Sequence, residues 1–209
     1  MHCADKRGLS ETSSHSAPTQ DPAYAQRLHT LESARWKRLI NAQAPYRWNV
    51  RRLRLGRTLD VGCGIGRNLA HLDGNGVGVD HNAAAIEVCR SKGLEAYTVE
   101  EFHTRPHALF DSLLAAHLVE HLSPPDGKEV LSSYLPYLKP GGSVVVITPQ
   151  ERGYASDDTH VYFADFTAVE GLLADLGVRV DRTYSFPLPR WTGRFFTYNE
   201  FVTVGRKLE

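Results

Sequence analysis

The chain has 209 residues, of which 42% are hydrophobic and 23% charged, a balance that is ordinary for one globular domain. Its 24 basic and 24 acidic residues cancel, and three cysteines are too few for a disulfide framework or a thiolate zinc site. The sequence contains no apolar run long enough for a signal peptide or a membrane span. We therefore expect a single hydrophobic core and a cytoplasmic location.

The first part of the chain differs in composition from the rest. Residues 1–22 are polar and predict a flexible tail. Residues 23–55 predict a helical lid, because apolar side chains recur there at helical spacing until Pro45. The segment from Arg27 to Arg57 holds nine Lys or Arg residues and one acid, Glu32. It could attract an anionic membrane surface, nucleic acid or an acidic substrate, although a solvated helix face explains the same charges.

From residue 56 onward, strand and helix signals alternate. This alternation predicts a doubly wound, mostly parallel sheet of the Rossmann-like α/β class, with residues 56–209 as the core of one domain that spans 23–209. In chain order the expected elements are a strand at 58–61, a helix to Leu72, a strand at 76–79, a helix at 83–91, and strands at 95–99 and 110–115, then a helix around 128–138 and a strand at 144–148.

The last third of the chain predicts a helix at 166–176 followed by strands at 178–185 and 199–206. Two final strands without a helix between them favour an antiparallel hairpin at the edge of the sheet. The linker between them, residues 186–196, is rich in aromatic residues and proline. It could form the wall of a substrate cavity or cover the sheet edge.

The segment Leu59–Gly66 has the sequence LDVGCGIG, an apolar strand that ends in three alternate glycines. Such a turn lets the backbone come very close to a ligand. Fourteen residues after Gly66, Asp80 ends a second short strand, where a carboxylate suits a ribose diol. The dinucleotide pattern G-x-G-x-x-G would require glycine where Arg67 stands, which disfavours a hydride-transfer enzyme. A glycine turn can also bind nothing, but the turn and the acid together indicate a nucleoside cofactor.

The glycine motif resembles motif I of class I S-adenosylmethionine (SAM)-dependent methyltransferases. From Pro45 to the C-terminus, further segments resemble the branch that contains the ubiquinone-biosynthesis O-methyltransferases. These segments are PYR at 45–47, TVEE at 98–101, FD at 110–111, LVEHL at 118–122, LKPGG at 138–142 and TP at 148–149. The resemblance implies a Rossmann-like fold and SAM as the cofactor.

The resemblance also implies roles for individual residues. It places Asp80 on the ribose hydroxyls, where charge-assisted hydrogen bonds form, although Asp80 could instead cap the helix that begins near Asn82. Arg47 matches an arginine near the cofactor carboxylate, with a surface ion pair as the alternative. The remaining positions are Gly62, Gly64 and Gly66 along the methionine moiety, Val99 and Glu100 at the adenine edge, and Ala116 where the chain passes the methionine moiety.

Three imidazoles and a carboxylate are candidates for acting on the acceptor. His117, Glu120 and His121 stand at i, i+3 and i+4, so a helical turn would bring them together, and His160 could approach from a neighbouring loop. We predict His117, His121 and His160 as catalytic residues, since imidazole titrates near neutrality and can act as a general base. Alternatively, these side chains only fill the pocket wall.

The same four residues, His117, Glu120, His121 and His160, could hold a divalent metal. Small-RNA 2′-O-methyltransferases and some quinone-pathway enzymes have the similar pattern E-x-x-E-H with a distant histidine, but here His117 replaces the first glutamate. Three imidazoles and one carboxylate suit zinc, manganese or iron better than magnesium. A bound ion would lower the pKa of a substrate hydroxyl.

The leading functional hypothesis is a SAM-dependent O-methyltransferase for a small hydroxylated, aromatic metabolite. Its partner would be a small-molecule substrate, and the possible ring contacts are Phe163, Trp191, Phe195 and Phe196. An N-methyltransferase would have much the same sequence. A metal-assisted RNA 2′-O-methyltransferase and a non-catalytic module that binds a partner through the basic segment are further alternatives, as is a peripheral contact with a membrane.

Overall fold

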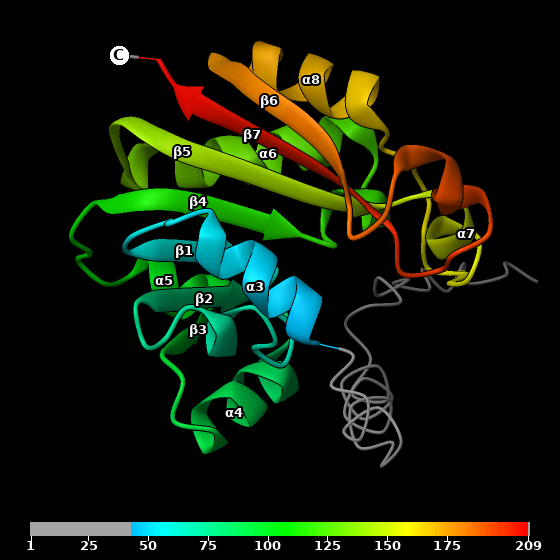
Figure 1. Ribbon diagram of the computed structural model, residues 1–209. Helices are drawn as coiled ribbons and strands as arrows, with labels where there is room; N and C mark the ends of the chain where they lie inside the picture. Colours follow the sequence, from blue (N-terminus) through cyan, green and yellow to red (C-terminus); the bar gives the residue numbers. More distant parts are fainter. Residues whose placement is uncertain (1–42, 209) are drawn as a thin grey trace, which may run out of the picture.

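The computed structural model describes residues 43–208, which form one central sheet with helices on both of its faces (Figure 1). The strands are β1 (Thr58–Val61), β2 (Gly76–Asp80), β3 (Ala96–Thr98), β4 (Phe110–Ala116), β5 (Leu138–Pro149), β6 (Val178–Phe186) and β7 (Glu200–Lys207). The α-helices are α3 (Ala44–Arg52), α4 (Ala83–Ser91), α5 (Val99–His103), α6 (Pro124–Tyr134), α7 (Glu151–Tyr154) and α8 (Phe166–Asp175). Short 3₁₀ turns are η2 (Leu69–His71), η3 (Val119–His121), η4 (Leu135–Tyr137) and η5 (Arg190–Arg194).

The strands follow the order β3-β2-β1-β4-β5-β7-β6 across the sheet. The first five pair in parallel, while β7 lies antiparallel between β5 and β6. This arrangement confirms the predicted Rossmann-like class and the antiparallel C-terminal hairpin, with β6 as the outermost strand.

Both faces of the sheet are covered, since the central strands β1 and β4 are buried at almost every position. Successive side chains of a strand point to opposite faces. On β4, Leu113 and Ala115 join the core formed with α5, α6 and α8, whereas Leu114 and Ala116 join the core formed with Val50 of α3. The two cores hold the sheet between two helical layers, and Figure 1 shows α3 crossing in front of it.

Three predicted boundaries are wrong. The glycine turn is followed by the single 3₁₀ turn η2 rather than by a helix to Leu72. Helix α6 starts at Pro124 because Ser123 caps it and proline is favoured in a first helical turn, and it ends before the predicted 138. Strand β5 begins at Leu138, well before the predicted 144, and includes the Pro-Gly-Gly segment at 140–142.

The predicted tail at 1–22 and most of the predicted lid at 23–55 lie outside the described residues. The described part of the lid segment contains α3, which starts at Ala44 with a proline in its first turn. Among residues 43–208, no helix is both long and apolar enough to cross a membrane.

Candidate active site

The glycine turn that follows β1 adopts a backbone that glycine alone adopts without strain. Gly62, Gly64 and Gly66 have φ angles of 74°, 52° and 80°, in the left-handed region. A Cβ on Gly62 would lie 2.8 Å from Leu118 Cδ1, and one on Gly66 would lie 2.6 Å from Leu94 Cδ1. The turn therefore presents bare main chain and leaves no room for side chains at these two positions.

Asp80, at the end of β2, ties the glycine turn to the start of α4. Its Oδ2 accepts a hydrogen bond from the Gly64 N–H at 2.8 Å, and its Oδ1 accepts one from the Asn82 N–H at 2.8 Å. Asn82, not Asp80, caps α4, because its side chain accepts from Ala84 and Ala85. Each carboxylate oxygen retains a further acceptor position for a ligand hydroxyl.

Asp60 is a polar residue of this site that the sequence analysis did not select. The side chain is buried, and neither carboxylate oxygen has a hydrogen-bond partner among residues 43–208. Burial, and after it the nearby Asp80 carboxylate, raises the pKa of Asp60 to about 8. An acid inside an otherwise apolar strand, two residues before the first glycine, was the signal that could have identified it. An unpartnered carboxyl here suits a ligand that carries a positive charge or a donor group.

The other predicted cofactor contacts lie at the same edge of the sheet, with one exception. Strand pairing puts Asp80 opposite Thr98, so Val99 and Glu100, the first residues of α5, come directly beside the end of β2. Ala116 ends β4, next to β1. The exception is Arg47, which lies on α3 near η2. The pKa of His71 in η2 is lowered to about 4, first by burial of that histidine and then by the charge of Arg47. Arg47 forms no ion pair among the described residues, so these residues do not support the alternative that Arg47 is part of a surface ion pair.

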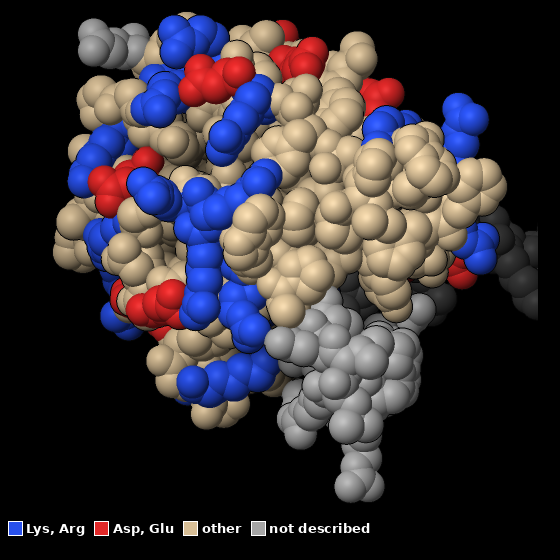
Figure 2. Space-filling model, in the orientation of Figure 1, with Lys and Arg blue, Asp and Glu red and all other residues tan. Residues whose placement is uncertain are grey.

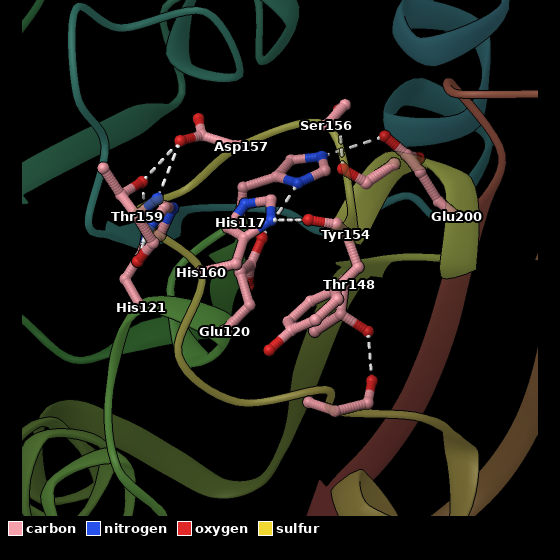
Figure 3. A network of polar contacts seen from close by, with 12 residues as sticks. His117, Glu120, His121, Thr148, Tyr154, Ser156, Asp157, Thr159, His160 and Glu200 are labelled. Carbon is pink, nitrogen blue, oxygen red and sulfur yellow. Dashed lines mark hydrogen bonds and ion pairs between the residues drawn. The ribbon is translucent and has the colours of Figure 1, made fainter.

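A second group of polar side chains surrounds the end of β4 (Figure 3). His117 has a left-handed backbone, with φ at 57°. Its Nδ1 lies 3.1 Å from Glu120 Oε1, and its Nε2 lies 3.0 Å from Glu200 Oε1 at the start of β7. Desolvation lowers the pKa of His117, but the bonds to the two carboxylates outweigh it and raise the pKa to about 10. His117 is therefore an imidazolium that donates to both glutamates at neutral pH.

Glu120, His121 and His160 form a second cluster, which shares Glu120 with this bridge. One potential ligand atom from each residue lies within 4.8 Å of the others. The predicted helical turn is present as η3, which brings His121 next to Glu120, and His160 approaches from the loop after α7. Glu120 is fully buried, and its Oε2 has no hydrogen-bond partner in the described part of the chain.

The tautomers of the two histidines follow from their partners. Nδ1 of His160 donates to the Tyr154 carbonyl at 2.8 Å, and Nδ1 of His121 lies 3.2 Å from the Thr159 carbonyl. Because a carbonyl can only accept, Nδ1 carries the proton and Nε2 keeps its lone pair. Both Nε2 atoms can thus take up a proton or coordinate a metal. Burial is the main cause that lowers the pKa of His121.

The structure brings together three of the four predicted metal ligands. His117 stands apart from them in function, since carboxylates occupy both of its ring nitrogens. Glu200 was not predicted, and nothing in its local sequence distinguishes it. The glycine turn and the polar cluster around His117 are the two halves of the candidate site. They are adjacent, because Leu118, which follows His117 in the sequence, packs against Gly62.

The predicted aromatic contacts fall into two kinds. Phe163 packs edge-on against Tyr154 and Phe201 and is half-buried. Trp191 and Phe195, on and beside η5, have 69% and 77% of their surfaces exposed. Phe196 is half-buried.

Comparisons with known proteins agree with this fold. A search of curated proteins finds no match. The chain superposes on a SAM-dependent methyltransferase from Archaeoglobus fulgidus with a TM-score of 0.62 and 21% identity, covering 78% of this chain and 93% of that one. A chain of a Haloferax volcanii complex between a methyltransferase activator and a methyltransferase gives a TM-score of 0.68 and 18% identity, with 93% and 98% covered.

A magnesium protoporphyrin IX methyltransferase from Synechocystis, solved with bound SAH, gives a TM-score of 0.60 and 11% identity, with 90% and 100% covered. The methyltransferase domain family matches residues 26–183, which is most of the chain. The predicted enzyme class, a SAM-dependent methyltransferase, is confirmed, while the ubiquinone branch stays a prediction. The chain belongs to the methyltransferase domain family.

Proposed function

We propose that this enzyme transfers a methyl group from SAM to a hydroxyl of a small hydroxylated, aromatic metabolite. The observation that carries the proposal is the contact between the two halves of the site, in which Leu118 lies against Gly62. A cofactor on the glycine turn would have its reactive end beside His117 and η3. The polar cluster would then face the acceptor.

In this proposal the glycine turn and its neighbours hold SAM. Gly62, Gly64 and Gly66 would line the methionine moiety, and the free acceptor positions of Asp80 would bind the ribose hydroxyls. The unpartnered Asp60 fits the positively charged end of the cofactor. The remaining assignments are the adenine edge for Val99 and Glu100, the methionine moiety for Ala116, and the cofactor carboxylate for Arg47.

When bound, SAM supplies an electrophilic methyl group for an in-line displacement. The protein's tasks are to align the acceptor, to exclude water and to remove the hydroxyl proton. Nε2 of His160 or of His121 can accept that proton, since both atoms keep a lone pair. The His117 imidazolium is unsuited to this step and instead holds Glu120 in place.

We also propose a divalent metal on Glu120, His121 and His160, with zinc, manganese or iron favoured by two imidazoles and one carboxylate. The donor set fits, because Glu120 Oε2 is buried and unpartnered while both imidazoles keep Nε2 free. Backbone carbonyls that orient both histidines are typical of metal sites. The ion would lower the pKa of the acceptor hydroxyl.

The test of the reaction is a screen with methyl-labelled SAM against phenols and the matched anilines. Labelled ethers from phenols are the expected products. Labelled amines alone would replace the proposal by N-methylation, and calorimetry that detects no SAM binding would overturn the cofactor assignment as well.

The test of the metal is elemental analysis of protein purified without chelator. We expect a zinc, manganese or iron content that falls in His160→Gln and persists in His103→Gln, whose exposed ring contacts Tyr137 on another part of the surface. Full activity after dialysis against EDTA would contradict a metal-assisted step.

A further inference from the structure

Two segments that are far apart in the sequence form one continuous surface beside the site. Residues 44–57 contain α3, and residues 186–199 form the loop with η5. The Tyr46 hydroxyl donates to the Tyr198 carbonyl at 2.6 Å, and the Trp48 ring stacks on Phe186 with a centroid distance of 6.2 Å. We call the surface of these two segments the arginine–aromatic face.

This face exposes large apolar side chains. Trp191 and Phe195 are the most exposed, at 69% and 77%, and Trp48, Leu188 and Tyr198 are also exposed. Single exposed apolar residues are normal, but several together on a soluble domain mark an interaction surface. Their composition, Trp, Tyr, Phe and Leu, is typical of side chains that enter the boundary between water and lipid.

The charge of the same face has one sign. The two segments contain seven arginines and no Asp or Glu. Within residues 43–208, two of these arginines form ion pairs. Arg51 pairs with Asp73 and Arg190 pairs with Glu151, and both acids lie outside the two segments. The other five arginines form no ion pair among these residues; they are Arg47, Arg52, Arg54, Arg57 and Arg194. Figure 2 shows Lys and Arg gathered on the side of the molecule where α3 lies, beside a broad area without charged side chains.

We propose that the arginine–aromatic face binds the surface of an anionic phospholipid bilayer. Arginines would meet the headgroups, while Trp191, Phe195 and Leu188 would enter the outer apolar layer. Such adsorption requires no membrane-spanning helix. Because the loop ends next to Glu200, a bilayer on this face would lie beside the acceptor end of the site.

The stacking of the arginines favours lipid over single-stranded RNA as the occupant. The Arg52 guanidinium lies 4.6 Å from the centroid of Trp48 and 5.0 Å from that of Tyr184, while Arg182 covers Tyr184 at 5.8 Å. These cations leave Trp48, and Tyr184 beside the face, little free ring surface for stacking on bases. Trp191 and Phe195 have exposed rings, which suit either occupant. Leucine and proline in the loop offer no stacking surface, but they suit a lipid boundary.

The test is flotation of the full chain with vesicles of phosphatidylcholine alone or mixed with phosphatidylglycerol. We expect binding to the mixed vesicles that weakens with salt. The double variant Arg54→Gln/Arg194→Gln should bind about 25-fold more weakly, from about five-fold per arginine. The matched control is Arg179→Gln/Arg206→Gln, whose exposed arginines pair with Asp181 at the sheet edge and which should bind as wild type.

The apolar part of the face is tested with the double variant Trp191→Ser/Phe195→Ser, which should lose vesicle binding. The matched control is Val161→Ser/Leu208→Ser, which removes exposed apolar groups outside the face and should bind as wild type. Circular dichroism establishes that each variant is folded. In a Trp36→Phe/Trp48→Phe background, Trp191 emission should shift to the blue on mixed vesicles. No flotation with mixed vesicles would overturn the proposal. The proposal would also be overturned if the protein bound single-stranded RNA but not vesicles, and if the arginine variants weakened that RNA binding.

Discussion

The proposed cofactor half and the proposed acceptor half of the site are built in opposite ways. The cofactor half, from Asp60 to Asn82, is one strand-turn-strand segment whose shape depends on backbone conformation. The acceptor half combines η3, the loop around His160 and the start of β7, and it depends on charged and hydrogen-bonding side chains. The two therefore differ in which changes they tolerate: the first should fail through steric clash, the second through loss of charge.

The largest expected effect is on the cofactor half. Gly66→Ala combines left-handed strain of about 1–2 kcal/mol with overpacking of about 1–3 kcal/mol against Leu94 and Cys89. Gly93→Ala is the matched control, because Gly93 has a similar φ of 74° but open space around it. Urea unfolding should show the larger loss for Gly66→Ala, and calorimetry should show weakened SAM binding in that variant alone. Equal losses in both variants would mean that the tight fit of the turn is unimportant.

A smaller effect is expected for Asp80→Asn, which keeps the shape but removes the charge and one acceptor. Hydrogen bonds to charged groups contribute about 1.5–3 kcal/mol, so SAM affinity should fall about 10- to 100-fold. Asp111→Asn, which disrupts a carboxylate paired with Lys139 at the opposite end of β4, should leave the affinity unchanged. An unaltered dissociation constant for Asp80→Asn would remove the ribose assignment.

An effect of a different kind is expected from the acceptor half, as a dependence of stability on pH. The pKa of His117 is raised from 6.5 to about 10 in the folded protein. Protonated His117 therefore stabilises the fold fully below pH 6.5, and this contribution is lost as the pH rises toward about 10. His117→Gln removes the titrating group, so wild type should lose stability relative to the variant across that window. Parallel curves of unfolding free energy against pH would contradict the imidazolium bridge.

Much of the fold was predictable because it follows from local patterns. The apolar stretch at 58–61, the glycines after it and the acid ending the next strand lie in one short segment, and the structure has them where expected. The antiparallel edge was predictable from two strands without an α-helix between them. The predicted helix after Gly66 was wrong because apolar spacing over one turn cannot distinguish a 3₁₀ turn from an α-helix.

Within the site, the sequence could nominate residues but could not assign their partners. His117, Glu120, His121 and His160 all appeared as potential bases or ligands. The capture of His117 in an ion-paired bridge, which shares Glu120 with the cluster of His121 and His160, depends on Glu200, 83 residues from His117 along the chain. That pairing exists because β7 inserts antiparallel beside β5 and brings its first residue to the end of β4.

The sequence by itself determined the Rossmann-like architecture, the glycine turn and the acid beside it, because backbone freedom and strand periodicity are properties of neighbouring residues. Only the tertiary structure decided that His117 is a cation between two carboxylates and that Asp60 is a buried, unpartnered acid. Protonation depends on burial and on charges within a few ångströms, and these are set by which distant segments the sheet brings together.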